Sequence, residues 1–349
     1  MASEMLKGKV TDGTIWYAKD LEDDSSWLHT LSEDQRQEVT TALQIAKSKG
    51  ATVASIKKED FPLPHLGQLF STMRTELDKG YGFSVLRGMP IEGLSIEDIE
   101  LLYSGITAYF GEKFNQDTKG TLIDHVADRG NDYSDISVRG YTTNEQLTPH
   151  CDSGDLVVLL CVRPAKEGGM NNISCTMAVY NEIVENHPEY LEPLYQGFHY
   201  NIRGNGPIGP YQDITKHKVP VFCYHDGMLS CRYNQKAILT AEELPGVEPL
   251  TQLEKDAINY VAELAMRDDI RFDVHLEAGD IAFLNNNTVL HNRDAFVDYE
   301  EPEKKRLLLR QWVNLDGARE LPLEFADHYN TGPRRGPAIH EEVEGERIR

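Results

Sequence analysis

The sequence predicts a mainly β protein with flanking helices, whose core is a double-sheet jelly roll or barrel. Many short apolar runs separated by turns follow one another after residue 147, which is typical of such β architectures. Helical patterns fill most of the first hundred residues and return at 253–267, so we expect the helices to pack outside the sheets. We predict one domain over 1–349, with a mainly helical part at 1–110, a lid-like segment at 111–148 and the core at 147–315, into which 253–267 is inserted.

The helical part is predicted from caps and apolar spacing. Ser32 is a typical N-cap for a helix that runs to residue 48, and Ser95 caps another that reaches residue 110. A further helix is expected at 65–77. Residues 82–88 are apolar and bounded by glycines, which favours a short strand.

The segment 111–148 is polar, rich in Asp, Asn and Gly, and weakly periodic. A stretch of this length inside a compact domain is usually functional or mobile. It directly precedes the first candidate metal ligand, so we expect part of it to form a wall or lid of the site.

The core pattern begins with a continuous apolar run at 156–162, which suits a strand buried on both faces. A helix is expected at 177–185, and another at 253–267. Further short strands are predicted at 197–202, 219–224, 228–232 and 281–284.

Composition excludes several classes of partner. The net charge of −22 over 349 residues argues against nucleic acid, because phosphate binding requires a dense cationic face. No apolar run is long enough to span a membrane, and residues 1–7 lack the pattern of a signal peptide. The five cysteines show no paired spacing and are expected to be reduced thiols in a cytoplasmic protein. We expect a small-molecule substrate, and the oligomeric state is left open.

The strongest candidate site combines His150 and Asp152 with His291, which follows after 138 intervening residues. Alternate side chains of an extended segment share a face, so His150 and Asp152 point the same way. His291 ends a predicted strand that follows the turn 285–287. Two imidazoles and one carboxylate on one side of a metal are the ligand set of non-haem Fe(II) oxygenases, and leave the other side open. The other ten histidines are expected to be structural.

Two arginines follow the last candidate ligand. Arg306 stands fifteen residues after His291 and suits the far carboxylate of the cosubstrate 2-oxoglutarate. Arg310 shares its face of a predicted strand but lies about 13 Å farther along, too far for both to hold one carboxylate. We predict that Arg310 contacts a carboxylate of the substrate. A structural ion pair with an acidic neighbour is the alternative.

These motifs resemble the TauD/TfdA (taurine dioxygenase-like) family of Fe(II)/2-oxoglutarate-dependent oxygenases. The resemblance covers roughly residues 80–313. Its matching pieces are the His150-x-Asp152 motif, Gly168-Gly169 leading to 178–181, the distal segment 291–296 and the pair Arg306 and Arg310, together with 82–88 and Gly111-Glu112 upstream.

The resemblance implies a double-stranded β-helix core, iron held by His150, Asp152 and His291, and 2-oxoglutarate held by Arg306. Many members place Thr or Ser just after the paired glycines to assist the cosubstrate. Here Asn171 falls at the matching place, and we predict that its amide assists 2-oxoglutarate; Thr176 is the alternative.

The predicted function is therefore oxidation of an unactivated C–H bond in a small carboxylate-bearing molecule, such as an amino acid or related acid. Such an enzyme consumes O2 and 2-oxoglutarate and releases succinate and CO2, with hydroxylation, desaturation and ring closure all open as outcomes. Two alternatives use the same scaffold. A Zn-dependent hydrolase would leave Arg306 without a role, and a non-catalytic cupin-like binding protein would not need an open metal face.

Overall fold

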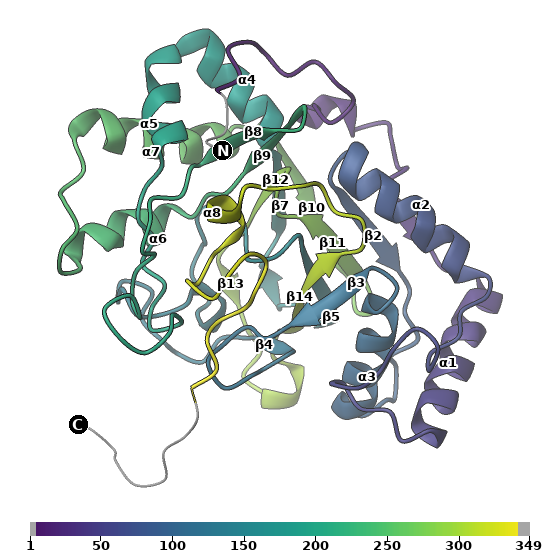
Figure 1. Cartoon of the computed structure of the whole chain (residues 1–349). Helices are drawn as coiled ribbons and strands as arrows, with labels where there is room; N and C mark the ends of the chain where they lie inside the picture. The colour runs from purple at the N-terminus through teal and green to yellow at the C-terminus, as the bar shows by residue number, and fades with distance from the viewer. Residues whose placement is uncertain (1–4, 341–349) are drawn as a thin grey trace, which may run out of the picture.

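A computed structural model of the chain describes residues 5–340, in which two β-sheets contribute to one core (Figure 1). The larger sheet has the strand order β1-β2-β11-β5-β14-β3, with β4 also paired to β14. Its strands are β1 (Leu28–Thr30), β2 (Phe83–Arg87), β3 (Gly111–Phe114), β4 (Asp124–Val126), β5 (Leu156–Arg163), β11 (Ile281–Asn285) and β14 (Leu307–Leu315). The smaller sheet has the order β10-β7-β12, formed by β10 (Arg271–Val274), β7 (Asn171–Cys175) and β12 (Val289–Arg293).

Two short two-stranded sheets complete the β structure of the described residues. They are β8 (Phe222–His225) with β9 (Met228–Cys231), and β6 (Glu167–Gly168) with β13 (Phe296–Val297). The predicted sheet-rich fold with flanking helices is confirmed at this level.

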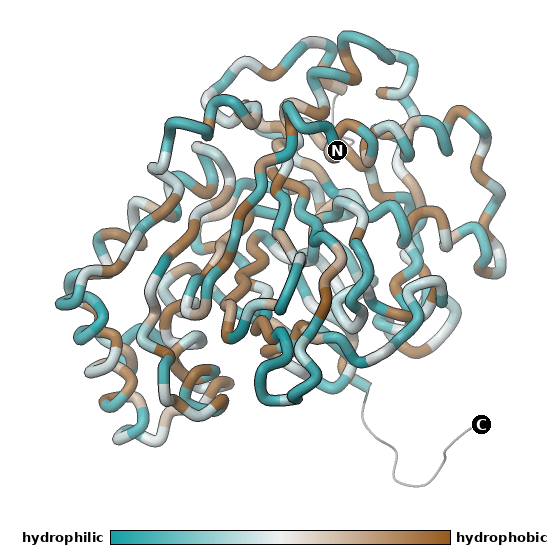
Figure 2. The backbone as a smooth tube through the Cα atoms, turned by 180° about the vertical axis from the view of Figure 1, so that it is seen from behind, coloured by the Kyte–Doolittle hydropathy of each residue, from teal (hydrophilic) through white to brown (hydrophobic). Residues whose placement is uncertain are grey.

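Strand β5 lies inside the larger sheet, between β11 and β14, and both of its faces are buried. Leu156, Val158 and Leu160 pack under the N-terminal helices, whereas Val157 and Cys161 join the core shared with the smaller sheet. This double burial explains the continuous apolar run and confirms the prediction for 156–162. Figure 2 shows hydrophobic stretches running through the central strands.

The N-terminal helices cover the outer face of the larger sheet as α1 (Glu33–Ser48), α2 (Leu66–Lys79) and α3 (Ile96–Thr107). All three were predicted from sequence. Ser32 caps α1 reciprocally: its hydroxyl accepts from the Gln35 amide at 3.3 Å, and the Gln35 side chain accepts from the Ser32 amide at 2.9 Å. This capping box fixes where the first helix begins.

Other helices lie on the far side of the molecule (Figure 1). The predicted helices at 177–185 and 253–267 are confirmed as α4 (Thr176–Asn186) and α7 (Gln252–Ala265). Three short helices were not predicted, namely α5 (Leu191–Gln196), α6 (Gln235–Leu239) and α8 (Leu323–Ala326).

Two predictions require correction. Residues 197–202 form only isolated bridges, at Phe198 and Asn201, because their backbone groups pair with several separate segments, including Val219, Ala237 and Asp213, and not with one continuous strand. The segment 111–148 is not entirely lid-like, since it supplies β3 and β4 to the larger sheet. The polar side chains of these edge strands hid their strand character.

Within residues 5–340, no helix has the length and apolar character needed to cross a membrane. The five cysteines are buried and form no disulfide in this part of the chain, as expected. Residues 1–4, on which the absence of a signal peptide was partly argued, lie outside the described residues.

Candidate active site

The structure brings the three predicted metal ligands together. His150 and His291 form an antiparallel bridge in which each backbone amide donates to the other residue's carbonyl, at 2.9 and 2.8 Å. Their ring centroids lie 4.5 Å apart, and Nε2 of His291 lies 3.9 Å from Oδ2 of Asp152. Residues far apart in the sequence therefore meet at the middle of β12 (Val289–Arg293).

A buried asparagine turn holds the loop that carries Asp152. Residues 285–287 join β11 to β12, and the Asn286 side chain crosses to the ligand loop. Its Oδ1 accepts from the Asp152 amide at 3.1 Å, while its Nδ2 donates to the carbonyls of Ser153 and Gly154 at 3.3 and 3.1 Å. The turn thus does more than reverse the chain, because the Asn286 side chain fixes the backbone at Asp152.

Both imidazoles are neutral, the form in which a ring nitrogen can offer its lone pair to a metal. Nδ1 of His150 lies 2.8 Å from the Thr148 carbonyl, which can only accept, so Nδ1 carries the proton and Nε2 keeps its lone pair. Burial lowers the pKa of His150, and burial together with the neighbouring His150 lowers the pKa of His291 to about 3. Neutral imidazole is the form that binds metals.

Asp152 is ionised and faces Arg310. Burial alone would raise its pKa, but Arg310 and the nearby imidazoles outweigh this and hold the pKa at about 2. Nη1 of Arg310 lies 3.4 and 3.3 Å from the two carboxylate oxygens. Among residues 5–340, no group of three His, Cys, Asp or Glu side chains is arranged to hold a metal ion. The three predicted ligands are neighbours, but the carboxylate of Asp152 pairs with Arg310.

Arg310 has a protein acceptor for each guanidinium nitrogen. Besides the contact to Asp152, Nε donates to Gln116 Oε1 at 2.8 Å and Nη2 donates to Asp124 Oδ2 at 3.1 Å. Gln116 and Asp124 come from the segment predicted to be a wall or lid. Of the two predicted roles, the structural ion pair is therefore present, and Arg310 also lines the cavity described below.

Arg306 lies just before β14 and is buried, with 3% of its surface exposed. Its backbone amide donates to Asp298 Oδ1 at 2.7 Å, but Nη1 of its guanidinium has no hydrogen-bond partner. The guanidinium stacks 5.0 Å from the centroid of Phe296. Burial lowers its pKa to about 10. A Cβ at Gly169 would stand 3.4 Å from Nε, so the glycine leaves space beside this group.

Asn171 occupies the first position of β7, paired with Val274 and Arg293. Its Nδ2 donates to the Val274 carbonyl at 3.4 Å. Asn171 also lines a narrow interior space together with His291, Leu159 and Leu284. The residue thus lies beside a predicted ligand, whereas Thr176 donates to the Thr288 carbonyl.

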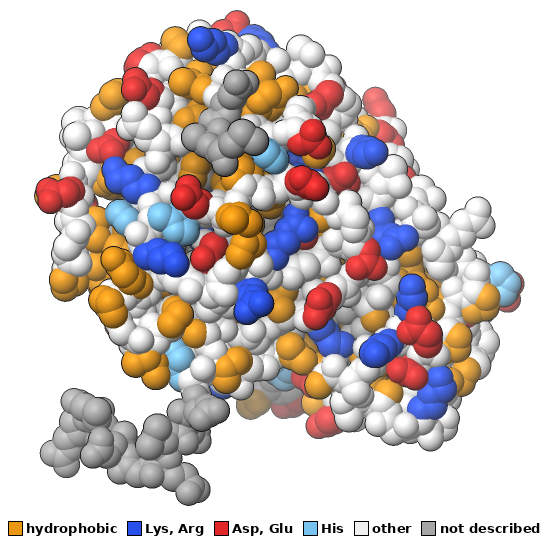
Figure 3. Space-filling model, in the orientation of Figure 1, with side chains coloured by type: hydrophobic (Ala, Val, Ile, Leu, Met, Phe, Trp, Pro, Cys, Tyr) orange, Lys and Arg blue, Asp and Glu red, His pale blue; other side chains and the backbone are white. Residues whose placement is uncertain are grey.

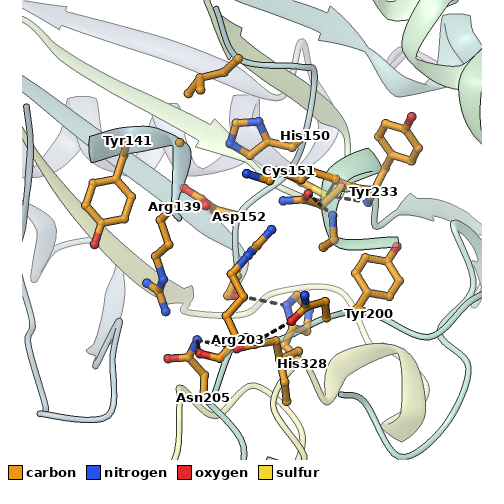
Figure 4. Close-up of a pocket in the computed structure, with 18 of the residues that line it drawn as sticks. Arg139, Tyr141, His150, Cys151, Asp152, Tyr200, Arg203, Asn205, Tyr233 and His328 are labelled. Atoms are coloured by element: carbon orange, nitrogen blue, oxygen red, sulfur yellow. Dashed lines mark hydrogen bonds between the residues drawn. The ribbon is translucent and has the colours of Figure 1, made fainter. Parts of the chain in front are cut away.

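A cavity of about 150 Å³ opens beside the predicted ligands (Figure 4). Sequence analysis identified only His150, Asp152 and Arg310 in its wall and grouped His328 with the structural histidines. It missed other lining residues, namely Arg139, Tyr141, Tyr200, Arg203, Arg232, Lys236, Trp312, His328 and Tyr329. The polarity of 111–148 signalled Arg139 and Tyr141, while nothing in the sequence pattern signalled the C-terminal residues 328 and 329.

Comparison with known proteins gives a consistent result. Residues 44–312 match the family described as "Taurine catabolism dioxygenase TauD, TfdA family". The FR-33289 synthase of Streptomyces rubellomurinus (strain ATCC 31215) is 30% identical over 328 residues, covering 93% of this chain and 96% of that protein. The taurine hydroxylase-like protein SAT17 of Stachybotrys chartarum (strain CBS 109288 / IBT 7711) is 27% identical over 316 residues, covering 87% of this chain and 80% of that protein.

Solved structures share the fold. Asparagine oxygenase in complex with Fe(II), 2S,3S-3-hydroxyasparagine and succinate superposes with a TM-score of 0.66 at 17% identity, over 82% of this chain and 93% of that one. The non-heme iron oxygenase OrfP in complex with Fe and alpha-ketoglutaric acid gives a TM-score of 0.60 at 13% identity, over 83% and 94%.

Proposed function

Because the chain belongs to the TauD/TfdA family of Fe(II)/2-oxoglutarate-dependent oxygenases, we propose that its cavity oxidises an unactivated C–H bond of a small carboxylate-bearing molecule. The enzyme is an oxidoreductase whose cofactor chemistry uses Fe(II), 2-oxoglutarate and O2. The bound iron and cosubstrate supply the oxidation, with succinate and CO2 released. The finer architecture proposed for the two sheets is a double-stranded β-helix core.

His150, Asp152 and His291 are the proposed iron ligands. The donor set fits: two neutral imidazoles and one ionised carboxylate lie within a few ångströms of one another. The Thr148 carbonyl fixes the tautomer of His150, and Arg310 keeps Asp152 charged. The chain therefore supplies both the ligands and the groups that orient them.

Arg306 is the proposed partner of the far carboxylate of 2-oxoglutarate. The observation that carries this proposal is its buried guanidinium, which has an unpartnered Nη1 and no carboxylate within 4.0 Å among the described residues. A buried charge without a partner is costly, so an anionic ligand fits here. The narrow interior space lined by His291 and Asn171 supports the assignment of Asn171 as an assisting donor.

An amino acid or a related acid is the proposed substrate. Two structural neighbours were solved in complex with hydroxylated amino acids: asparagine oxygenase with 2S,3S-3-hydroxyasparagine and a mutant of OrfP with (3S)-hydroxy-L-Arg. Arg310 lines the cavity beside Asp152 and is the proposed contact for the substrate carboxylate through its Nη1 edge. The residues around the cavity orient the substrate and exclude water, and hydroxylation, desaturation and ring closure are all compatible with them.

Anaerobic reconstitution tests the proposal. Adding Fe(II) and then 2-oxoglutarate is expected to produce a weak visible charge-transfer band, which requires the chelated cosubstrate. A screen of amino acids and related acids in air should then identify compounds that stimulate succinate formation. Activity with Zn(II) alone, or no band and no succinate with any compound, would instead favour a hydrolase or a binding protein.

A further inference from the structure

The cavity has a charge opposite to that of the chain. The protein carries a net charge of −22, and acidic and basic side chains mix over the face displayed in Figure 3. The cavity wall nevertheless contains one carboxylate, Asp152, and five cationic side chains, namely Arg139, Arg203, Arg232, Lys236 and Arg310. Asp152 is already paired with Arg310. The other four cations have no carboxylate within 4.0 Å among residues 5–340.

Two of these cations already donate hydrogen bonds to backbone carbonyls of the protein. Lys236 donates to the carbonyls of Tyr133, Asp135 and Val138, and so ties the 133–138 loop to α6. Arg232 is buried and lies over the Tyr200 ring, with Nη1 and Nη2 directed at two backbone carbonyls. These two raise the positive potential of the cavity without offering a free bidentate edge.

Arg139 and Arg203 keep free donors. Arg139 uses only Nη1, for the Gln116 carbonyl at 2.9 Å, and Arg203 uses only Nε, for the Ile136 carbonyl at 3.0 Å. Their side chains extend into the space below Asp152 in Figure 4. Burial, followed by repulsion from Arg139, lowers the pKa of Arg203. Two like charges therefore face one space, and neither has a carboxylate within 4.0 Å among the described residues.

The backbone at Arg203 has an unusual conformation. Its φ angle of 50° lies in the left-handed region, which is uncommon for a residue other than glycine, asparagine or aspartate. Asn201 Oδ1 accepts from the Arg203 amide at 3.0 Å and stabilises the turn. Such backbone conformations persist where the surrounding structure enforces them, commonly at ligand sites.

We infer that Arg139 and Arg203 form a second anion subsite, which binds a phosphate or phosphonate group of the substrate. Two guanidinium groups with unused donors and no ion pair among the described residues match a group that carries close to two negative charges and three acceptor oxygens, whereas a carboxylate would neutralise only one. This inference rests on the proposed function, because it names a second feature of the same substrate. The phosphorus group would lie at the cavity wall formed by Arg139 and Arg203.

Three amino acids of matched length can test the subsite. They are 2-amino-4-phosphonobutanoate, O-phosphoserine and glutamate, which end in a phosphonate, a phosphate ester and a carboxylate. Their binding is measured by calorimetry on the full chain, loaded anaerobically with Fe(II) and saturating 2-oxoglutarate. At least one phosphorus compound should bind about tenfold more tightly than glutamate. The two arms distinguish phosphonate from phosphate ester as the source of the group.

Variants then connect the preference to the two arginines. Arg139→Met and Arg203→Met should each remove most of the preference for phosphorus, while Arg74→Met on α2, outside the cavity, should leave it intact. Thermal unfolding of each variant separates lost binding from lost folding.

Three results would overturn the subsite: equal binding of all three amino acids, no binding of either phosphorus compound up to about 10 mM, or an unchanged preference in both cavity variants. Failure here would leave the oxygenase proposal standing if the charge-transfer band and succinate formation are present. Loss of the band itself would instead remove the proposed function.

Discussion

Arg306 and Arg310 lie four residues apart at the start of β14 and are almost equally buried, with 3% and 6% of their surfaces exposed, yet their environments are opposite. Every guanidinium nitrogen of Arg310 has a protein acceptor, including Asp124 and Asp152. Arg306 keeps an unpartnered Nη1. Burial lowers the pKa of both, but the two carboxylates reverse this for Arg310, whereas Arg306 stays at about 10.

The contrast favours Arg306 over Arg310 as the arginine that binds the cosubstrate, because only Arg306 keeps a buried donor without a partner. Arg310 completes a buried ion-pair network that keeps Asp152, a proposed iron ligand, charged. Arg306 lies beside Phe296 and Gly169, and no described residue accepts a hydrogen bond from its Nη1. Substitutions can separate these roles, because we expect Arg310 to affect the stability of the ligand-free protein and Arg306 to affect the affinity for the cosubstrate.

The largest effect is expected at Asp152, which pairs with Arg310 and is also a proposed iron ligand. Asp152→Ala removes one of three proposed iron ligands, so succinate formation should fall to background and bound Fe(II) should be lost. Iron content and turnover measure this. Asp268→Ala is the matched control, because that side chain is 98% exposed and distant from the site, and it should leave both unchanged. Normal iron content and turnover in Asp152→Ala would show that the ligand set is wrong.

Arg310→Met should give the largest loss of stability. It leaves Asp124 and Asp152 buried without their cation, and breaking a buried pair typically costs about 3–5 kcal/mol. Chemical denaturation of the ligand-free protein measures this cost. The predicted role in substrate binding adds a weaker substrate affinity, with uncoupled 2-oxoglutarate consumption largely kept. Unchanged stability would mean that the network contributes little to folding.

Arg306→Met should behave in the opposite way. Removing a buried charge without a partner should leave the free energy of unfolding unchanged or higher, while the KM for 2-oxoglutarate rises at least about tenfold through loss of a charge pair. Steady-state kinetics with varied 2-oxoglutarate and denaturation of the ligand-free protein test both halves. An unchanged KM would assign the cosubstrate carboxylate to another cation, with Arg310 and Arg293 the nearest candidates by sequence.

Asn171→Ala should have the smallest effect. One neutral hydrogen bond to the cosubstrate is worth about 0.5–1.5 kcal/mol, which corresponds to a rise of about two- to tenfold in the KM for 2-oxoglutarate. Asn171→Thr, which restores the residue type common in the family, should recover most of this loss. A KM that is unchanged in the alanine variant would restrict Asn171 to its role in pairing β7 with β10.

The sequence predicted the placement of His150 and Asp152 on one face and the buried strand β5 because both depend on local rules. Alternation placed His150 and Asp152 on one face, and a continuous apolar run indicated double burial. The partners of Arg310 could not be predicted, since Asp124 lies 186 residues away and reaches it only through the pairing of β4 with β14. The cationic cavity was also missed, because its members come from loops, from α6 and from β14, which only the folded chain brings together.

An anaerobic crystal structure with Fe(II) and 2-oxoglutarate would decide between the two arginines. We expect iron bound by His150, Asp152 and His291, with the far carboxylate of 2-oxoglutarate on Arg306 and with Arg310 still bonded to Asp124 and Gln116. A cosubstrate whose far carboxylate lies on Arg310, or a metal bound without His291, would contradict this expectation.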